Sequence, residues 1–167
     1  MNRSQLVFWI STCFVFAVDR VTKVWAERTL QVGESVPGID GWYDWTLYYN
    51  PGAAGGIFSG QLGFLIIVSS LAILALIWYM RKGQHDNNLV LQLGLGMMLG
   101  GAIGNLFDRV FYGHVIDFIN PIDKSYIFNL ADKGIRYGLY LGLIGLLLVS
   151  WKRRRAAKRL AAERSAE

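Results

Sequence analysis

Residues 64–80 read FLIIVSSLAILALIWYM and contain no charged side chain. A helix that crosses the hydrocarbon layer of a membrane needs about 20 mainly apolar residues. Three more runs, at residues 6–25, 89–107 and 134–151, are also mainly apolar and of similar length. We therefore predict an integral membrane protein with four transmembrane helices.

The composition of the whole chain agrees with a membrane protein. Of its 167 residues, 53% are hydrophobic and 17% are charged, and the mean hydropathy is +0.32. This is more apolar than an ordinary soluble domain. The length suits one domain, which we assign to residues 1–151, followed by a basic tail over residues 152–167. The single cysteine, Cys13, excludes an intramolecular disulfide, a cysteine-based zinc site and an iron–sulfur cluster.

Basic residues predict which ends of the helices face the cytoplasm. The net charge is +5, and Lys and Arg concentrate in the tail, KRRRAAKRLAAER at residues 152–164, with Arg81 and Lys82 after the second run and Arg3 before the first. Cytoplasmic loops carry an excess of such residues. We expect both termini in the cytoplasm and residues 26–63 and 109–129 outside. We also expect the tail to lie against anionic lipid and to bind no nucleic acid.

The two outer segments are expected to form small structures at the membrane surface. Residues 42–49, WYDWTLYY, favour short strands at the interface, where Trp and Tyr rings are enriched. Residues 52–59 suit a short interfacial helix or a turn. In the second segment, the Asn120-Pro121 pair predicts a turn between apolar pieces at residues 115–119 and 126–128.

The third and fourth apolar runs each carry glycines spaced four apart. They are Gly96, Gly100 and Gly104 in the third run and Gly134, Gly138 and Gly142 in the fourth. Small residues at this spacing let helix backbones approach closely in lipid. We predict that these glycines pack the third and fourth helices together and bring their outer ends close.

Polar residues gather at one depth of the predicted bundle. At or near the outward ends of the first, third and fourth helices lie Asp19, Lys23, Asn105, Asp108, Arg109, Asp117, Asn129 and Asp132, and Asn50 lies in the first outer loop. Ionisable groups inside a membrane are costly, so each needs a partner or a function. Asp19 and Lys23 could form an ion pair within one helix or help to shape a site. Arg109 could be an interfacial anchor, or a donor to peptide carbonyls or a lipid ester.

Two of these acids are candidates for catalysis. Asp117 sits inside the apolar stretch VIDFI at residues 115–119, and Asp132 opens the fourth apolar run. An aspartate in such surroundings must be protonated, paired or functional. If the two carboxyl groups meet, they would share one proton and supply a base and an acid together for the attack of water on a peptide bond.

Other catalytic arrangements find little support in the sequence. His85 and His114 are expected on opposite sides of the membrane, so they cannot build one metal site. No Ser or Cys stands in a nucleophile setting near a histidine, and no Ser-Lys pair stands out. Carboxylate chemistry is therefore the chemistry that the sequence offers.

Five short motifs resemble those of the lipoprotein signal peptidases, also called signal peptidase II. They are DRVTK at residues 19–23, NPGAA at 50–54, GGAIGNLFDR at 100–109, GHVIDFI at 113–119 and FNLAD at 128–132. Each motif alone is a weak signal, but the five occur in order over nearly the whole chain before the tail. The resemblance implies four transmembrane helices with a small extracytoplasmic β-sheet cradle and a short interfacial helix, a membrane all-α fold.

The resemblance also implies roles for individual residues. Asp117 and Asp132 would be the catalytic dyad of an aspartic endopeptidase. The implied substrate contacts are Asn50, Asn105, Arg109 and Asn129, and the implied supporting residues are Asp19 and Lys23. No metal and no organic cofactor are implied.

The implied substrate is a prolipoprotein that carries diacylglycerol on its lipobox cysteine and is cut just before that cysteine. The enzyme would be a multi-pass protein of the bacterial inner membrane, with its active site near the extracytoplasmic face. We expect a monomer in contact with membrane phospholipid.

The sequence departs from the family at Lys133 and Arg136, where small or apolar residues are usual. Arg136 lies four residues after Asp132, so a guanidinium on the same helical face would lower the pKa of Asp132 and leave Asp117 as the proton carrier. A permanent ion pair could instead disable the dyad.

Three other functions stay open at this point. One alternative is a homologue that binds lipidated precursors but cuts them poorly. A small ion or proton conductor is less favoured, since residues 64–80 and 137–151 offer no polar path across the membrane. A structural scaffold would need neither acid.

Overall fold

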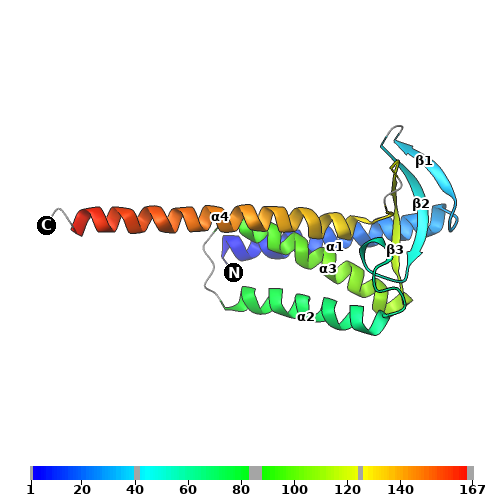
Figure 1. Ribbon diagram of the computed structural model, residues 1–167, viewed down its shortest axis with the longest axis horizontal. Coiled ribbons are helices and arrows are strands. Elements are labelled where there is room, and N and C mark those ends of the chain that lie inside the picture. The colour runs from blue at the N-terminus through cyan, green and yellow to red at the C-terminus, as the bar shows by residue number, and fades with distance from the viewer. Residues whose placement is uncertain (1, 40–41, 83–87, 124–125, 165–167) are drawn as a thin grey trace.

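Four long helices run along one axis of the molecule, which we describe from a computed structural model (Figure 1). The structure describes residues 2–39, 42–82, 88–123 and 126–164. The helices are α1 (Arg3–Thr29), α2 (Leu62–Arg81), α3 (Leu89–Tyr112) and α4 (Leu130–Arg164). All four are long and apolar enough to cross a membrane. They confirm the four predicted spans, but α4 begins at Leu130 and continues as a helix to Arg164, beyond the predicted span at both ends.

The ends of α3 are set by local sequence. The side chain of Asn88 accepts hydrogen bonds from the backbone N–H groups of Val90 and Leu91, which caps the first turn. At the other end Gly113 adopts a φ of 76°, a left-handed conformation that glycine reaches without strain and that stops the helix. The chain can therefore leave α3 and enter the strand that carries Asp117.

Helix α3 lies at the centre of the bundle and packs against the other three helices. A Cβ atom at Gly94 would lie 2.4 Å from the backbone nitrogen of Gly142, so α3 and α4 are in close backbone contact, as predicted. The Gly96 and Gly100 positions differ from the prediction, since a Cβ there would meet the backbone oxygens of Phe8 and Thr12 in α1. The stripe predicted for the contact with α4 therefore packs α3 against α1.

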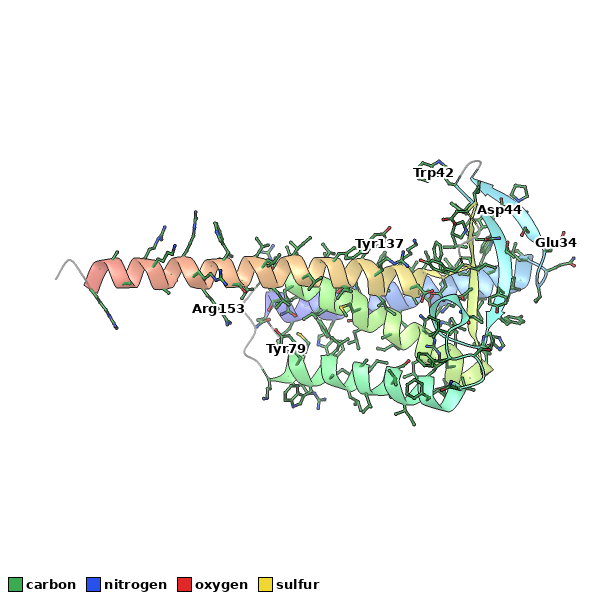
Figure 2. All side chains as sticks on the ribbon, in the orientation of Figure 1. Glu34, Trp42, Asp44, Tyr79, Tyr137 and Arg153 are labelled. Carbon is green, nitrogen blue, oxygen red and sulfur yellow. The ribbon has the colours of Figure 1, made fainter. Side chains whose placement is uncertain are left out.

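A three-stranded antiparallel sheet stands across one end of the bundle (Figure 1). Its strands are β1 (Ser35–Ile39), β2 (Tyr43–Asn50) and β3 (Val115–Pro121), in the order β1-β2-β3. In Figure 2, Trp42 and Asp44 mark the sheet, whereas Arg153 lies on the part of α4 that extends away from it. The start of α1 and the end of α4 lie away from the sheet.

Two details of the outer segments differ from or sharpen the predictions. Asn120 and Pro121 are the last residues of β3 and do not form the turn, which follows them. An edge strand tolerates a proline because one side of its backbone needs no partner. The predicted interfacial helix or turn is one short 3-10 helix, η1 (Ala54–Gly56).

Apolar packing fixes the sheet to the bundle. Ala26 of α1, Leu47 of β2, and Ile116 and Phe118 of β3 form one buried cluster. The ring of Trp45 also stacks on that of Phe118, with centroids 6.0 Å apart. The position of β3, and so of Asp117, is therefore set by contact with the end of α1.

Candidate active site

Asp117 and Asp132 come from different elements and meet at one small cavity. Asp117 lies on β3 opposite Tyr48 of β2, and Asp132 lies in the first turn of α4. Both line a cavity of about 20 Å³, which we call the small cavity. About 10–15 Å³ suffices for one water molecule, so the small cavity, which both acids line, has room for a single water.

Asn129 connects the two acids by direct hydrogen bonds. Its side-chain amide donates to Asp117 Oδ1 at 2.6 Å, and its side-chain oxygen accepts from the backbone N–H of Asp132 at 2.9 Å. Its own backbone N–H donates to Asp132 Oδ2 at 3.4 Å. Asn129 precedes the first residue of α4, so it caps the helix and holds Asp117 with the same side chain.

Two more amides orient the carboxyl groups. Asn50 donates to Asp117 Oδ2 at 2.9 Å, while its side-chain oxygen accepts from the backbone N–H of Gly52 at 2.9 Å. Asn105 of α3 donates to Asp132 Oδ1 at 2.8 Å. Asp117 thus accepts an amide hydrogen bond on each oxygen, and both acids are held in a fixed orientation.

Arg109 lines the small cavity and has a buried donor without a partner. Its Nη2 donates to the backbone oxygen of Gly52 at 3.1 Å, and its side chain lines the small cavity. Its Nε is buried and has no hydrogen-bond partner. A buried unpaired donor is costly, so this atom requires a partner that the described residues do not supply.

Burial and a neighbouring charge change the acidity of Asp117. Its side chain is 1% exposed. Desolvation by burial, with a smaller contribution from the charge of Asp132, raises the pKa of Asp117 to about 7, against the hydrogen bonds from Asn50 and Asn129, which lower it. Near neutral pH, Asp117 therefore exists in both protonation states, as an acid–base catalyst requires.

A cluster of four charged side chains lies next to the site. We call Asp19, Arg20, Lys23 and Asp108 the ion cluster. Lys23 Nζ lies 2.9 Å from Asp19 Oδ2 and 2.6 Å from Asp108 Oδ2, and Arg20 Nη2 lies 2.5 Å from Asp108 Oδ1. The predicted ion pair between Asp19 and Lys23 is therefore present, and both side chains are fully buried.

The ion cluster connects three helices to the site. Asp19 Oδ1 accepts from the backbone N–H of Ala131 in the first turn of α4 at 3.0 Å. Lys23 donates to Asn105 Oδ1 at 3.1 Å, and Asn105 in turn binds Asp132. The cluster therefore holds the start of α4 and the amide that orients Asp132.

A large groove extends from the small cavity between α2, α3 and α4. It encloses about 610 Å³, and most of its walls are apolar side chains such as Ala72, Leu76 and Leu139. Asn105, Arg109 and Asp132 line both the groove and the small cavity. A molecule with an apolar chain in the groove would thus have its polar end near Asp132 and the small cavity.

Comparison with known proteins shows the family to which the chain belongs. The signal peptidase (SPase) II family matches residues 11–148. This chain belongs to the signal peptidase II family. It is accordingly an aspartic peptidase and a multi-pass membrane protein of bacterial type.

Relatives and solved structures are similar to most of this chain. The lipoprotein signal peptidase of Bacillus subtilis (strain 168) is 35% identical over 153 residues, which cover 90% of this chain and 99% of that protein. That of Desulfitobacterium hafniense (strain Y51) is 37% identical over 150 residues, 90% of this chain and 99% of that protein. A bacterial membrane enzyme solved by the in meso method at 2.3 Å resolution superposes with a TM-score of 0.77 at 34% identity and 88% coverage of both chains.

Lys133 and Arg136, the two cations that follow Asp132, do not form an ion pair with it. The guanidinium of Arg136 donates to the hydroxyl of Tyr126, and Lys133 Nζ lies 3.9 Å from the centroid of the Phe128 ring. Among the described residues, no ion pair joins either cation to Asp132. The disabling ion pair considered from sequence is thus wrong for this structure, because an aromatic partner lies beside each cation.

Three residues of the site were not assigned a role from sequence. Arg20 and Asp108 complete the ion cluster, and the signal was available, since charged residues at membrane depth require partners. Tyr126 lines both the small cavity and the groove, but it precedes α4 in a loop where no pattern marks it.

The described residues offer no cluster of metal ligands. Within residues that the structure describes, no three His, Cys, Asp or Glu side chains gather to hold a metal ion. His114 contacts the ring of Tyr49, whereas His85 lies outside the described residues.

Proposed function

We propose that this chain removes the signal peptide from prolipoproteins that carry diacylglycerol on the lipobox cysteine, and that Asp117 and Asp132 catalyse the cut before that cysteine. The observation that carries this proposal is the small cavity, which both carboxyl groups line and which has room for one water. Relatives at 35–37% identity are named lipoprotein signal peptidases, which supports this proposal.

The two acids divide the proton transfers. Asp132 acts as the base that takes a proton from the water as its oxygen attacks the peptide carbonyl. Asp117, whose raised pKa of about 7 lets it carry a proton, donates to the developing oxyanion. The proton taken by Asp132 then passes to the leaving amine as the carbon–nitrogen bond breaks, and a hydroxyl group of the tetrahedral intermediate returns a proton to Asp117 as the new carboxyl group forms. Such acid–base assistance contributes about 10² to 10⁴-fold to the rate.

The remaining polar residues bind the substrate. The unpartnered Nε of Arg109 donates to a peptide carbonyl of the substrate. Asn50, Asn105 and Asn129 keep the acids in place beside the bound chain. The acyl chains of the diacylglyceryl group occupy the large groove, where apolar walls shield them from polar surroundings.

The orientation in the membrane follows from charge. Lys and Arg gather in residues 152–164, at the end of α4 away from the sheet, so that end and both termini are cytoplasmic. The sheet and the two acids then lie at the extracytoplasmic face of the inner membrane.

Residues 1–151 form the peptidase domain, and residues 152–167 form a cytoplasmic tail near anionic lipid. The enzyme works as a monomer surrounded by phospholipid.

A cleavage assay with two peptides tests this function. Purified protein in detergent is incubated with a lipobox peptide that carries diacylglycerol on its cysteine and with the same peptide unmodified. We expect only the modified peptide to be cut, with a product whose mass places the cut directly before the cysteine. A cut at another bond, or equal cleavage of the unmodified peptide, would contradict the proposal.

The pH dependence of the reaction tests the role of Asp117. Because its carboxyl group is protonated below about pH 7 and ionised above, the donor form is lost as the pH rises. We expect kcat/KM for the modified peptide to fall as the pH increases above about 7. The measurement is a series of initial rates from about pH 5 to about pH 9, with stability checked at each pH. A constant kcat/KM across the upper half of this range would exclude Asp117 as the proton donor.

A further inference from the structure

Arg136 occupies a defined position one helical turn from Asp132. It lies one helical turn after Asp132 on α4, and long side chains in helices lean toward the N-terminus, here toward the acids. Its guanidinium donates to the Tyr126 hydroxyl, and its Cζ lies 5.7 Å from the centroid of that ring. Tyr126 therefore orients the guanidinium.

The pair stands at the boundary between polar and apolar parts of the large groove. Arg136 and Tyr126 both line the groove, and Tyr126 also lines the small cavity. Beyond Arg136, α4 contributes Leu139 to the groove wall, and α2 contributes Leu76. The guanidinium thus lies where a substrate would change from peptide to hydrocarbon.

Arg136 has donors left for a ligand. A guanidinium carries five N–H groups and accepts no hydrogen bond. Its hydrogen bond in the described part of the chain goes to Tyr126, and no carboxylate there forms an ion pair with it. Several of its N–H groups can therefore donate to oxygens of a molecule in the groove.

The linkage in a diacylglyceryl group matches these donors. Each of its two esters has a carbonyl oxygen that accepts hydrogen bonds, and neither carries a charge or a donor. These esters lie between the modified cysteine and the acyl chains, at the same boundary that Arg136 marks in the groove. We propose that Arg136, positioned by Tyr126, binds the ester carbonyls of the diacylglyceryl group. This assignment rests on the proposed function.

Lys133 provides a matched control on the same helix. It also adds a positive charge near Asp132, but it lies over the Phe128 ring and lines a separate groove with residues such as Phe14 and Met97. A general effect of positive charge on Asp132 would appear for both cations. A contact with the ester oxygens would appear for Arg136 alone.

The experiment compares an ester substrate with its ether analogue. Two lipobox peptides are made that differ in one respect: one carries a diacylglyceryl group and the other carries a dialkylglyceryl group of the same chain length, which lacks the carbonyl oxygens. We expect the unaltered enzyme to show a KM about tenfold lower for the ester, the effect of one charged hydrogen bond, with similar kcat values. In Arg136→Gln this ratio should fall to about twofold or less, and Lys133→Gln should keep it.

Tyr126→Phe tests the positioning step, because it keeps the ring and removes the acceptor of the guanidinium. We expect an ester-to-ether ratio between those of the unaltered enzyme and Arg136→Gln. The same ratio measured as binding to the Asp117→Asn variant gives a readout that does not depend on cleavage. Equal KM values for the two substrates in the unaltered enzyme, or a ratio that survives Arg136→Gln, would overturn the assignment. Failure of the unaltered enzyme to cut either substrate would instead overturn the proposed function.

Discussion

Asp117→Asn is expected to reduce the cleavage of a diacylglyceryl-modified peptide by about 10² to 10⁴-fold, because the amide can neither carry nor donate the proton. The substitution is nearly isosteric, and an amide oxygen can still accept the hydrogen bond from Asn50 or Asn129. The fold should therefore persist while the chemistry is lost. The measurement is kcat/KM in detergent, together with the thermal midpoint of unfolding.

Two further variants complete this test. Asp132→Asn should cause a loss of similar size, and the double variant should lose little more, since the two acids act as one unit. Asp44→Asn is the control, because it makes the same change in β2 at the sheet position marked in Figure 2. The dyad would be excluded by cleavage that persists in both single variants, whereas a loss that also occurs in Asp44→Asn would point to a general effect on the sheet.

The transmembrane helices could be predicted because their signal is local and strong. Each span depends on its own length and hydropathy, so the four runs of sequence correspond to α1–α4. The residues at which the helices end were harder to predict, since a helix can continue beyond its apolar run into polar sequence. The basic residues after Trp151 are strong helix formers, and α4 continues through them to Arg164.

Part of the site could be predicted because a charged side chain inside a membrane requires a partner. Asp19 and Lys23 lie four apart within a membrane span, and that spacing made their ion pair one of two alternatives, which the structure confirms. The hydrogen bond from Asn129 to Asp117 joins the start of a helix to a strand, and the sequence did not predict it, since the resemblance implied only a substrate contact for Asn129.

The sequence did not predict contacts that depend on how each helix is rotated about its own axis. Gly96 was expected to face α4, but its Cβ position faces Phe8 of α1, because spacing alone does not say which neighbour a stripe meets. From its spacing, the guanidinium of Arg136 was expected to act on Asp132, but it donates to the hydroxyl of Tyr126. A long side chain on a helix can turn to any partner in range, so its target required the structure.

The ion cluster leads to the second large effect, since Asp108→Asn is expected to lower the free energy of unfolding by about 3–5 kcal/mol. The four charges balance as two acids and two cations, with Asp108 in contact with both Lys23 and Arg20. Removing one acid leaves a buried positive charge without compensation. The measurement is the thermal midpoint in detergent, with Glu27→Gln at the exposed end of α1 as a control for loss of a surface carboxylate.

Restoring the balance of charge should reverse most of this loss. In the double variant Asp108→Asn with Arg20→Gln, one acid and one cation remain, as the pair of Asp19 and Lys23. We expect its midpoint to lie well above that of Asp108→Asn, although one charged residue more has been removed. Lys23 still donates to Asn105 in this variant, so the amide that orients Asp132 keeps its support and peptidase activity should return with stability. A double variant less stable than Asp108→Asn would show that the individual contacts of Arg20, and not the balance of charge, stabilise this part of the bundle.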